Sequence, residues 1–521
     1  MIKSHQKLPS SATKIKTLKA DYSLFSQMFI ACQRRQVDLD EFFSHENQPF
    51  PPSLAENGNI RIPHSKSDLV NCLFSDVEPG KKNISSSPPS TCVIIDGAYI
   101  AQSTRPAAVM TFNQYAVEKF KKKVTDIASS HRATRADVVF DRYLKSSIKA
   151  TARMKRGQSN ERKVKPEMCV AKNWNVFLLN GKNKTELFKF LAAKLTSECI
   201  DGDPIIVSTT EQQVVTSITT LDNMPLITPC NHEEADTRML LHANHASKTG
   251  HEHVTIRSAD TDVLILSVHF FKDLNLQCLW VATGIGSSFR YLPVHEICNT
   301  ISPTMTSGLL FYHAFSGCDS VFSFANVGKK TSFTVANAHS EIWNTFSELS
   351  VSPGDISETQ ISNVEEYTVY LYDQASNVKE VNKARRHLVA IGRTADRVPP
   401  TSAALLQHIK RSAYQAGHIW ACSLIAEPQL PPVSEWGWKV LQDGSVEPVW
   451  TVLPKASKAY RALFKCSCKK GCSVRCKCHM NYKLPCTELC KCKGNCRNNE
   501  RNRAECISST LQSASEGTST S

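Results

Sequence analysis

Nine of the chain's 20 cysteines lie within one short segment, and their spacing limits how that segment can fold. The pattern is C-x-C-x3-C-x3-C-x-C, then seven residues, then C-x3-C-x-C-x3-C, at Cys466, Cys468, Cys472, Cys476, Cys478, Cys486, Cys490, Cys492 and Cys496. Zinc takes four tetrahedral ligands, so nine thiolates can serve three ions only when three of them bridge. We therefore expect about three zinc ions. Because the segment has few apolar residues, metal binding would supply its folding energy.

A disulfide knot and a purely structural zinc clip are the alternatives for this segment. Residues 1–19 are polar and Lys-rich and lack the apolar core of a secretion signal. The longest apolar stretch, around Val263–Phe271, is too short to span a bilayer. We expect an intracellular protein, in which scattered cysteines stay reduced and clustered cysteines bind metal.

The formal net charge of +14 is concentrated in two segments. Residues 145–165 hold 8 Lys and Arg against 1 Glu, and residues 461–503 hold 12 against 2. Two basic patches on an otherwise near-neutral chain predict a polyanionic partner, most simply nucleic acid. The first patch alone would equally fit a solvated face.

A chain of 521 residues is long enough for two or more domains. Residues 1–88 form a polar lead-in of unreadable role, residues 341–455 a helix-and-loop connector, residues 456–500 the zinc domain and residues 501–521 a Ser/Thr-rich tail expected to be disordered. Between them, residues 89–340 alternate apolar runs with helical stretches. The predicted strands are Cys92–Ile95, Val138–Phe140, Ile205–Val207, Val254–Ile256 and Val263–Ser267. This alternation predicts an α/β fold with a mostly parallel sheet and helices on both faces.

Seven acidic residues occur where these strands end or where turns begin. They are Asp96, Asp141, Glu234, Asp236, Asp260, Asp262 and Asp319. Ligand sites in open α/β sheets lie at the carboxyl ends of the strands, so these acids can converge on one pocket. Converging carboxylates repel unless cations lie among them, and oxygen ligands suit Mg²⁺ or Mn²⁺. Two such ions would stabilise the attacking and leaving oxygens of a phosphodiester. Any one of these acids is more often a cap or turn residue than a ligand.

In their order along the chain, the acids resemble those of the flap endonuclease branch of the PIN-like nucleases. Asp96 ends the opening strand, Asp141 stands in a Val-Phe-Asp context, two acid pairs follow, and Asp319 lies in a Gly-x-Asp motif. The resemblance covers about residues 91–335 and implies a PIN-like fold with a two-metal site. It further implies that basic residues after the second acid steer the scissile phosphate; here these are Lys145, Lys149, Arg153 and Arg156. The run after Asp319 that grips duplex DNA in this family keeps one expected glycine, Gly328.

The cysteine spacing resembles the tesmin-type CXC domain, a three-zinc DNA-binding fold. This chain has one copy where such proteins often have two, and Arg475 replaces the Tyr that enters the minor groove. Arg can also enter a narrow minor groove, where it reads width more than sequence. The two regions together resemble a class of invertebrate proteins related to mobile elements, whose connector is similar to residues 405–408, 414–417 and 436–438.

The leading hypothesis is a metal-dependent, structure-specific nuclease that acts on DNA ends, flaps or single strands and is tethered by the zinc domain. The seven acids would hold the ions, and Lys145, Lys149 and Arg153 would orient the phosphate. The alternative is a chromatin or DNA-binding protein with an inactive nuclease fold, although the retention of all seven acids favours activity. A protein-interaction scaffold would leave both basic patches unexplained. From the inferred DNA partner we expect the protein to be located in the nucleus.

Overall fold

The computed structural model describes residues 38–46, 48, 50–56, 58–63, 65–75, 77, 87–107, 109–144, 147–149, 160–197, 203–284, 286–351, 353–454, 464–469, 472, 476–482, 484–496 and 498. The chain divides into two compact units. The sheet unit comprises Ile62–Ile361 and His408–Val449, and the second unit comprises Met1–Arg61, Ser362–Gln407 and Trp450–Ser521. The predicted tail, residues 501–521, lies outside the described residues.

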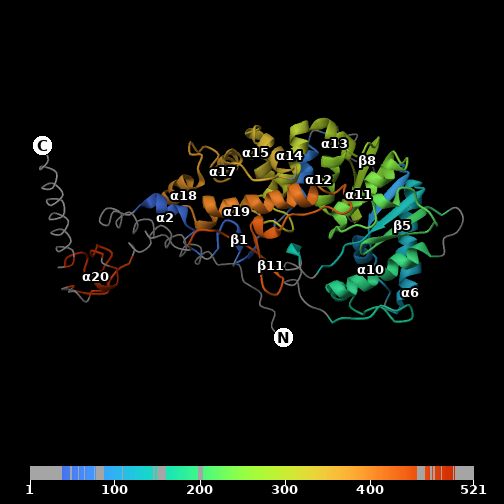
Figure 1. Cartoon of the computed structure of the whole chain (residues 1–521), viewed down its shortest axis with the longest axis horizontal. Coiled ribbons are helices and arrows are strands. Elements are labelled where there is room, and N and C mark those ends of the chain that lie inside the picture. Colours follow the sequence, from blue (N-terminus) through green and yellow to red (C-terminus); the bar gives the residue numbers. More distant parts are fainter. Residues whose placement is uncertain are drawn as a thin grey trace. The chain divides into compact units, whose positions relative to one another are not determined.

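A seven-stranded sheet, in the order β6-β5-β4-β3-β7-β8-β9, forms the centre of the sheet unit (Figure 1). Five neighbouring strands are parallel: β5 (Ile205–Thr210), β4 (Arg135–Val139), β3 (Cys92–Asp96), β7 (His253–Arg257) and β8 (Cys278–Thr283). The edge strands β6 (Gln213–Thr216) and β9 (Arg290–Pro293) are antiparallel to their neighbours.

Helices cover both faces of this sheet. On one face Val93, Ile95 and Val138 belong to an apolar cluster with residues of α7 (Lys122–His131) and α10 (Gly181–Thr196). On the other, Val207 packs with Leu241 of α11 (Ala235–Lys248). Burial from both sides explains why Cys92–Ile95 of β3 is an apolar run without alternation. The predicted α/β class, with a mostly parallel sheet, is confirmed.

Four of the five predicted strands are present, but the fifth prediction is wrong. Val263–Ser267 lies in helix α12 (Thr261–Phe270), which Asp260 caps by accepting a hydrogen bond from the Asp262 amide at 3.0 Å. Residues 263–268 are buried on every side of this helix. An all-round buried helix has no polar face, so its sequence shows no helical period and is easily taken for a buried strand.

The remaining elements of the sheet unit connect and flank these layers. They are α3 (Asp68–Leu73), α5 (Gly97–Ser103), α6 (Phe112–Gln114), η1 (Tyr115–Lys121), α9 (Trp174–Phe177), η2 (Met224–Leu226), η3 (Gly286–Ser288), α13 (Val294–Thr300), α14 (Pro303–Phe315), α15 (Lys329–Ala338), α16 (Ile342–Leu349), η5 (Tyr414–Trp420), η6 (Val433–Glu435), β10 (Trp438–Val440) and β11 (Val446–Pro448). No helix among the described residues is both long and apolar enough to cross a bilayer.

The second unit joins parts of the predicted lead-in to parts of the predicted connector. It contains α2 (Leu39–Ser44), β1 (Ala55–Glu56), β2 (Asn59–Ile60), most of α17 (Glu358–Tyr372), α18 (Val381–Ala390), η4 (Ala395–Arg397), the start of α19 (Ser402–Ala413) and α20 (Lys477–Tyr482). Helix α2 packs on α18, and Glu46 accepts a hydrogen bond from the Thr401 amide at 2.7 Å. The predicted 89–340 domain lies within the sheet unit, which extends further in both directions.

A buried polar network fixes α11 on the sheet. The Asp137 carboxylate of β4 accepts hydrogen bonds from Arg135 Nη2 and His242 Nδ1, both at 2.6 Å. Arg135, Asp137 and His242 are almost wholly buried. Breaking such a network leaves a buried charge unpaired, which costs about 3–5 kcal/mol. Because α11 begins with two of the predicted acids, this network also sets their position.

Candidate functional site

The structure brings all seven predicted acids to the carboxyl edge of the parallel strands. Asp96 is the last residue of β3, while Asp141 and Asp260 follow β4 and β7. Glu234 and Asp236 stand at the start of α11, Asp262 is in the first turn of α12, and Asp319 follows α14. Their charges influence one another: burial and then the nearby Asp141 raise the pKa of Asp96 to about 7. This edge of the sheet is therefore crowded with negative charge.

Several of these acids also cap helices. This is the role expected of a single acid at such a position, and these acids have it in addition to their place at the sheet edge. Asp96 accepts a hydrogen bond from the Tyr99 amide at 2.9 Å and caps α5. Asp141 reaches the start of α11 and accepts a hydrogen bond from the Ala235 amide at 2.9 Å. Helix N-termini carry partial positive charge, so they favour carboxylates at these places.

Two glycines allow the close approaches that the acids require. A Cβ atom at Gly97 would lie 2.3 Å from Phe140 Cε1, so the absence of a side chain lets the residues after Asp96 pack against the residue before Asp141. Gly317 has a φ of +111°, and a Cβ atom there would lie 2.6 Å from Ser323 Cβ. The turn that presents Asp319 therefore requires glycine.

Three of the acids form a group that could hold a metal ion. Oxygen atoms of Asp236, Asp260 and Asp262 all lie within 4.8 Å of one another. Burial and then the charge of Asp262 raise the pKa of Asp260 to about 7, and burial and then Asp260 raise the pKa of Asp236. A cation among these oxygens would relieve this repulsion. The donor set, oxygen alone, suits Mg²⁺ or Mn²⁺.

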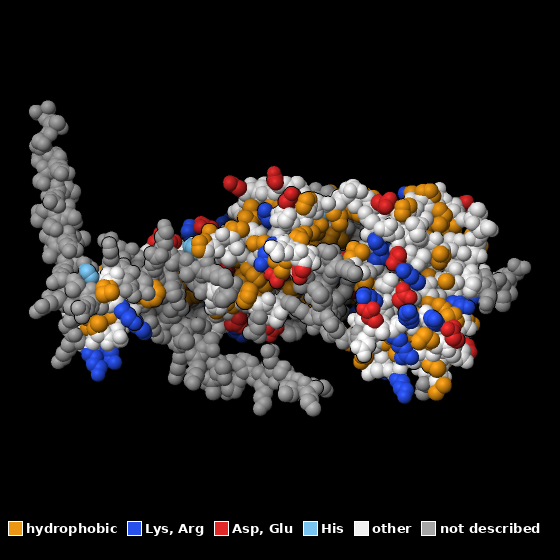
Figure 2. Space-filling view, turned by 60° about the horizontal axis from the view of Figure 1, so that its bottom comes forward, with side chains coloured by type: hydrophobic (Ala, Val, Ile, Leu, Met, Phe, Trp, Pro, Cys, Tyr) orange, Lys and Arg blue, Asp and Glu red, His pale blue; other side chains and the backbone are white. Residues whose placement is uncertain are grey.

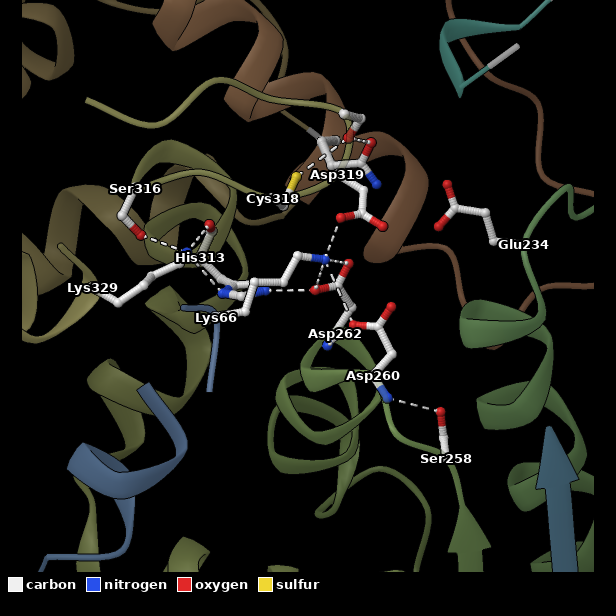
Figure 3. A network of polar contacts seen from close by, with 12 residues as sticks. Lys66, Glu234, Ser258, Asp260, Asp262, His313, Ser316, Cys318, Asp319 and Lys329 are labelled. Atoms are coloured by element: carbon white, nitrogen blue, oxygen red, sulfur yellow. Dashed lines mark hydrogen bonds and ion pairs between the residues drawn. The ribbon is translucent and has the colours of Figure 1, made fainter. Parts of the chain in front are cut away.

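Glu234 offers a further oxygen to the same region. Its Oε1 atom lies 2.7 Å from Lys149 Nζ, whereas Oε2 is buried and has no hydrogen-bond partner among the described residues. Figure 3 shows this carboxylate on the α11 side of the acidic group. An unpaired buried carboxylate oxygen is costly, and a bound cation would satisfy it.

Of the four predicted phosphate-steering residues, the structure describes one. Lys149 pairs with Glu234 and thus lies at the acidic group. Lys145, Arg153 and Arg156 lie outside the described residues.

Sequence reasoning missed Lys66, which comes from the lead-in. Its ammonium nitrogen lies 2.6 Å from an Asp319 oxygen, 3.1 Å from Asp262 Oδ1 and 3.7 Å from Asp260 Oδ1 (Figure 3). Ser65 and Asp68 give an S-x-x-D pattern typical of a helix start, but α3 has Ser67 as its N-cap. Ser65 Oγ instead donates a hydrogen bond to the Asp68 side chain at 2.9 Å. Nothing in that pattern connects Lys66 to acids that lie 194, 196 and 253 positions later.

Sequence reasoning also missed a series of buried hydrogen bonds behind Asp262. His313 Nε2 lies 2.8 Å from Asp262 Oδ1, and Lys329 Nζ donates to the carbonyl oxygen of His313 at 2.6 Å and to Ser316 Oγ at 2.8 Å. Lys329 belongs to the run that the flap endonuclease resemblance placed against duplex DNA, yet it is 2% exposed. It therefore supports the acidic site from inside.

The cysteine module brings its sulfur atoms together in three close groups. Three groups of four sulfur atoms, each within 4.8 Å of one another, are Cys466-Cys478-Cys486-Cys490, Cys466-Cys472-Cys476-Cys486 and Cys472-Cys486-Cys492-Cys496. Closest sulfur pairs lie 3.7–3.9 Å apart. With zinc–sulfur bonds of 2.3 Å, tetrahedral geometry requires about 3.8 Å. The module could hold zinc.

The simplest expectation is that three cysteines each bridge two ions. The shared cysteines in the structure differ from this pattern. Cys466 and Cys472 each belong to two groups and Cys486 to all three, whereas Cys468 packs against the cluster without joining any group. Among the described residues, none of the nine cysteines forms a disulfide. Arg475 lies outside the described residues.

No family model matches the chain, and no curated protein matches it. Among solved structures, a crystal structure of the bacteriophage T5 D15 protein with metal ions aligns with a TM-score of 0.31 and 14% identity, covering 62% of this chain and 96% of that chain. A T5 D15 flap endonuclease in a pseudo-enzyme–product complex with DNA and metal ions aligns with a TM-score of 0.31 and 12% identity, covering 58% of this chain and 99% of that chain.

Proposed function

We propose that the protein is a metal-dependent phosphodiesterase that cleaves DNA at ends, flaps or single strands. The observation that carries this proposal is the convergence of seven acids on one edge of a parallel sheet, with three of them grouped tightly enough to share a cation. Carboxylates in such numbers are unfavourable unless cations neutralise them. Hydrolysis of a phosphodiester is a reaction that such cations accelerate.

In this proposal Asp236, Asp260 and Asp262 hold the cation, and Glu234 completes the set. Mg²⁺ or Mn²⁺ bound there would polarise the phosphodiester and favour attack by water. Lys149, already at the site, would exchange its contact with Glu234 for one with the phosphate. Its ammonium group would then stabilise the charge that develops on the phosphate oxygens.

The cysteine module would bind the DNA that the sheet unit cleaves. Its described surface carries five exposed lysines and one exposed glutamate; the lysines are Lys465, Lys469, Lys477, Lys491 and Lys493. Figure 2 shows Lys and Arg side chains on this module, which contains α20. Exposed lysines bind the phosphate backbone without selecting a base sequence. A DNA partner would place the protein in the nucleus.

The decisive experiment compares cleavage by three proteins with Mg²⁺ or Mn²⁺ on single-stranded, duplex and flapped DNA. Asp260→Asn/Asp262→Asn should lose at least 100-fold in rate, because Asn can still cap α12 but cannot neutralise a cation. Asp273→Asn, at an exposed acid, is the matched control and should cleave like the wild type. Equal cleavage by the double variant would exclude the proposed site. DNA binding without cleavage would instead favour the inactive DNA-binding alternative.

A further inference from the structure

Lys66 is held in place by a small folded element rather than by a free loop. It lies two residues before α3, and its carbonyl oxygen accepts a hydrogen bond from the Leu69 amide at 3.2 Å. Leu69, Val70 and Leu73 of α3 are buried, and α3 packs against α15. The Lys66 side chain is only 16% exposed. Its ammonium group is therefore anchored at the acidic site by apolar packing of the helix that follows it.

The ammonium group of Lys66 has the surroundings of a bound cation. It contacts carboxylate oxygens from three residues, Asp260, Asp262 and Asp319. The group that could hold a metal ion contains Asp260 and Asp262 as well, but has Asp236 in place of Asp319. Two cation positions thus share two carboxylates, as in a two-ion site, and a lysine fills one of them.

We propose that this site binds one divalent cation, between Asp236, Asp260 and Asp262, and that the Lys66 ammonium group takes the place of a second. This inference deepens the proposed function, on whose site it rests. Two ions in a two-metal site lie about 3.5–4 Å apart, so an ammonium group that contacts both shared carboxylates excludes the second ion by charge and by volume. Glu234 Oε2, which is buried and has no hydrogen-bond partner in the described part of the chain, lies on the opposite side, where the single ion would be bound.

An ammonium group and a divalent ion differ in what they supply. Lys66 neutralises charge and donates hydrogen bonds, but it has no coordination position for water or a phosphate oxygen. The chemistry would then depend on one ion, with Lys66 holding Asp262 and Asp319 at fixed positions. The lead-in is in that case part of the active centre.

The test measures manganese stoichiometry in the zinc-loaded, full-length protein. Isothermal titration with Mn²⁺ gives the number of ions, and electron paramagnetic resonance separates a single ion from a spin-coupled pair. We expect one uncoupled Mn²⁺ in the wild type and two coupled ions in Lys66→Met, which removes the charge but keeps most of the length. Lys66→Arg keeps the charge and should bind one. Lys330→Met, at an exposed lysine, is the matched control and should also bind one.

Two ions in the wild type would overturn the inference, as would one ion in a folded Lys66→Met or no bound Mn²⁺ at all. Cleavage is scored separately on the same preparations. If the wild type binds two ions and cleaves DNA, the inference is wrong and the proposed function stands. If the wild type binds one ion and cleaves no DNA, the proposed function is wrong and the inference stands.

Discussion

Lys329 Nζ lies 3.0 Å from His313 Nδ1 in a fully buried contact. The Asp262 carboxylate only accepts hydrogen bonds, so His313 Nε2, 2.8 Å from Asp262 Oδ1, must carry the imidazole hydrogen. In the neutral imidazole Nδ1 is then the acceptor for a hydrogen of Lys329 Nζ. The contacts on both sides hold the histidine in one orientation, and the histidine in turn orients a carboxylate of the acidic site.

Replacing His313 should therefore weaken metal binding without any contact to the metal. Partners of this kind typically contribute 10- to 100-fold to affinity, so we expect a loss of about that size for His313→Leu. His313→Gln can still donate to Asp262 and should retain part of the affinity. Isothermal titration with Mn²⁺ measures both, and a folded His313→Leu with wild-type affinity would contradict the role.

Stability should depend on pH through Lys329. Burial is the main cause that lowers its pKa to about 7 from the ordinary 10.5. Between these values the unfolded chain binds the proton and the folded chain does not, so stability rises with pH across this window and is lowest below pH 7. The slope attributable to this residue is at most about 1.4 kcal/mol per pH unit.

Thiols and other lysines also titrate in this range, so the comparison must be with a variant. Lys329→Met removes the titrating group, and urea unfolding of both proteins between pH 6.5 and 10 gives the difference. Parallel pH profiles for wild type and variant would show that Lys329 stays charged when folded.

The shared cysteine of the zinc module should matter more than the unshared one. Cys486 belongs to all three ligand groups and Cys468 to none. We expect Cys486→Ser to lose more than one zinc ion per chain and most DNA binding, while Cys468→Ser loses at most one ion. Elemental analysis and fluorescence anisotropy with labelled DNA measure the two effects. Equal zinc loss in both variants would argue against this pattern of bridging.

The turn at Gly317 should tolerate no side chain. Gly317→Ala forces a residue with a Cβ atom to φ +111° and against Ser323, so we expect a loss of about 1–3 kcal/mol in stability. Mn²⁺ binding should also change, because Asp319 holds the Lys66 ammonium group at 2.6 Å. Gly354→Ala meets no atom within 4 Å and is the matched control. Thermal unfolding and Mn²⁺ titration measure the effects. A fully stable Gly317→Ala would show that this turn adapts.

The parts of the fold that could be predicted were those encoded within a few neighbouring residues. An apolar run followed by an acid predicted β3 with Asp96 and β4 with Asp141, because strand and acid adjoin in the chain. The same reasoning failed at α12, whose apolar run has no polar face to reveal its period. Local pattern alone does not separate a short buried strand from a buried helix.

The supporting residues of the site could not be predicted for a different reason. Lys66 and Asp262 are separated by 196 positions, and His313 and Asp262 by 51. No local pattern marks such partners, since only the completed topology places them together. The acids could be found because the sheet gathers strand ends, whereas Lys66 reaches them through the packing of α3 on α15.

The second unit is assembled from three separated stretches of chain, Met1–Arg61, Ser362–Gln407 and Trp450–Ser521. On the ribosome, α2 emerges more than 300 residues before its partner α18. At a synthesis rate of about 5–20 residues per second, the apolar side chains of α2 remain without this partner for some tens of seconds. Phe42 and Phe43, buried in the finished protein, are thus exposed to chaperones and to neighbouring nascent chains throughout that interval.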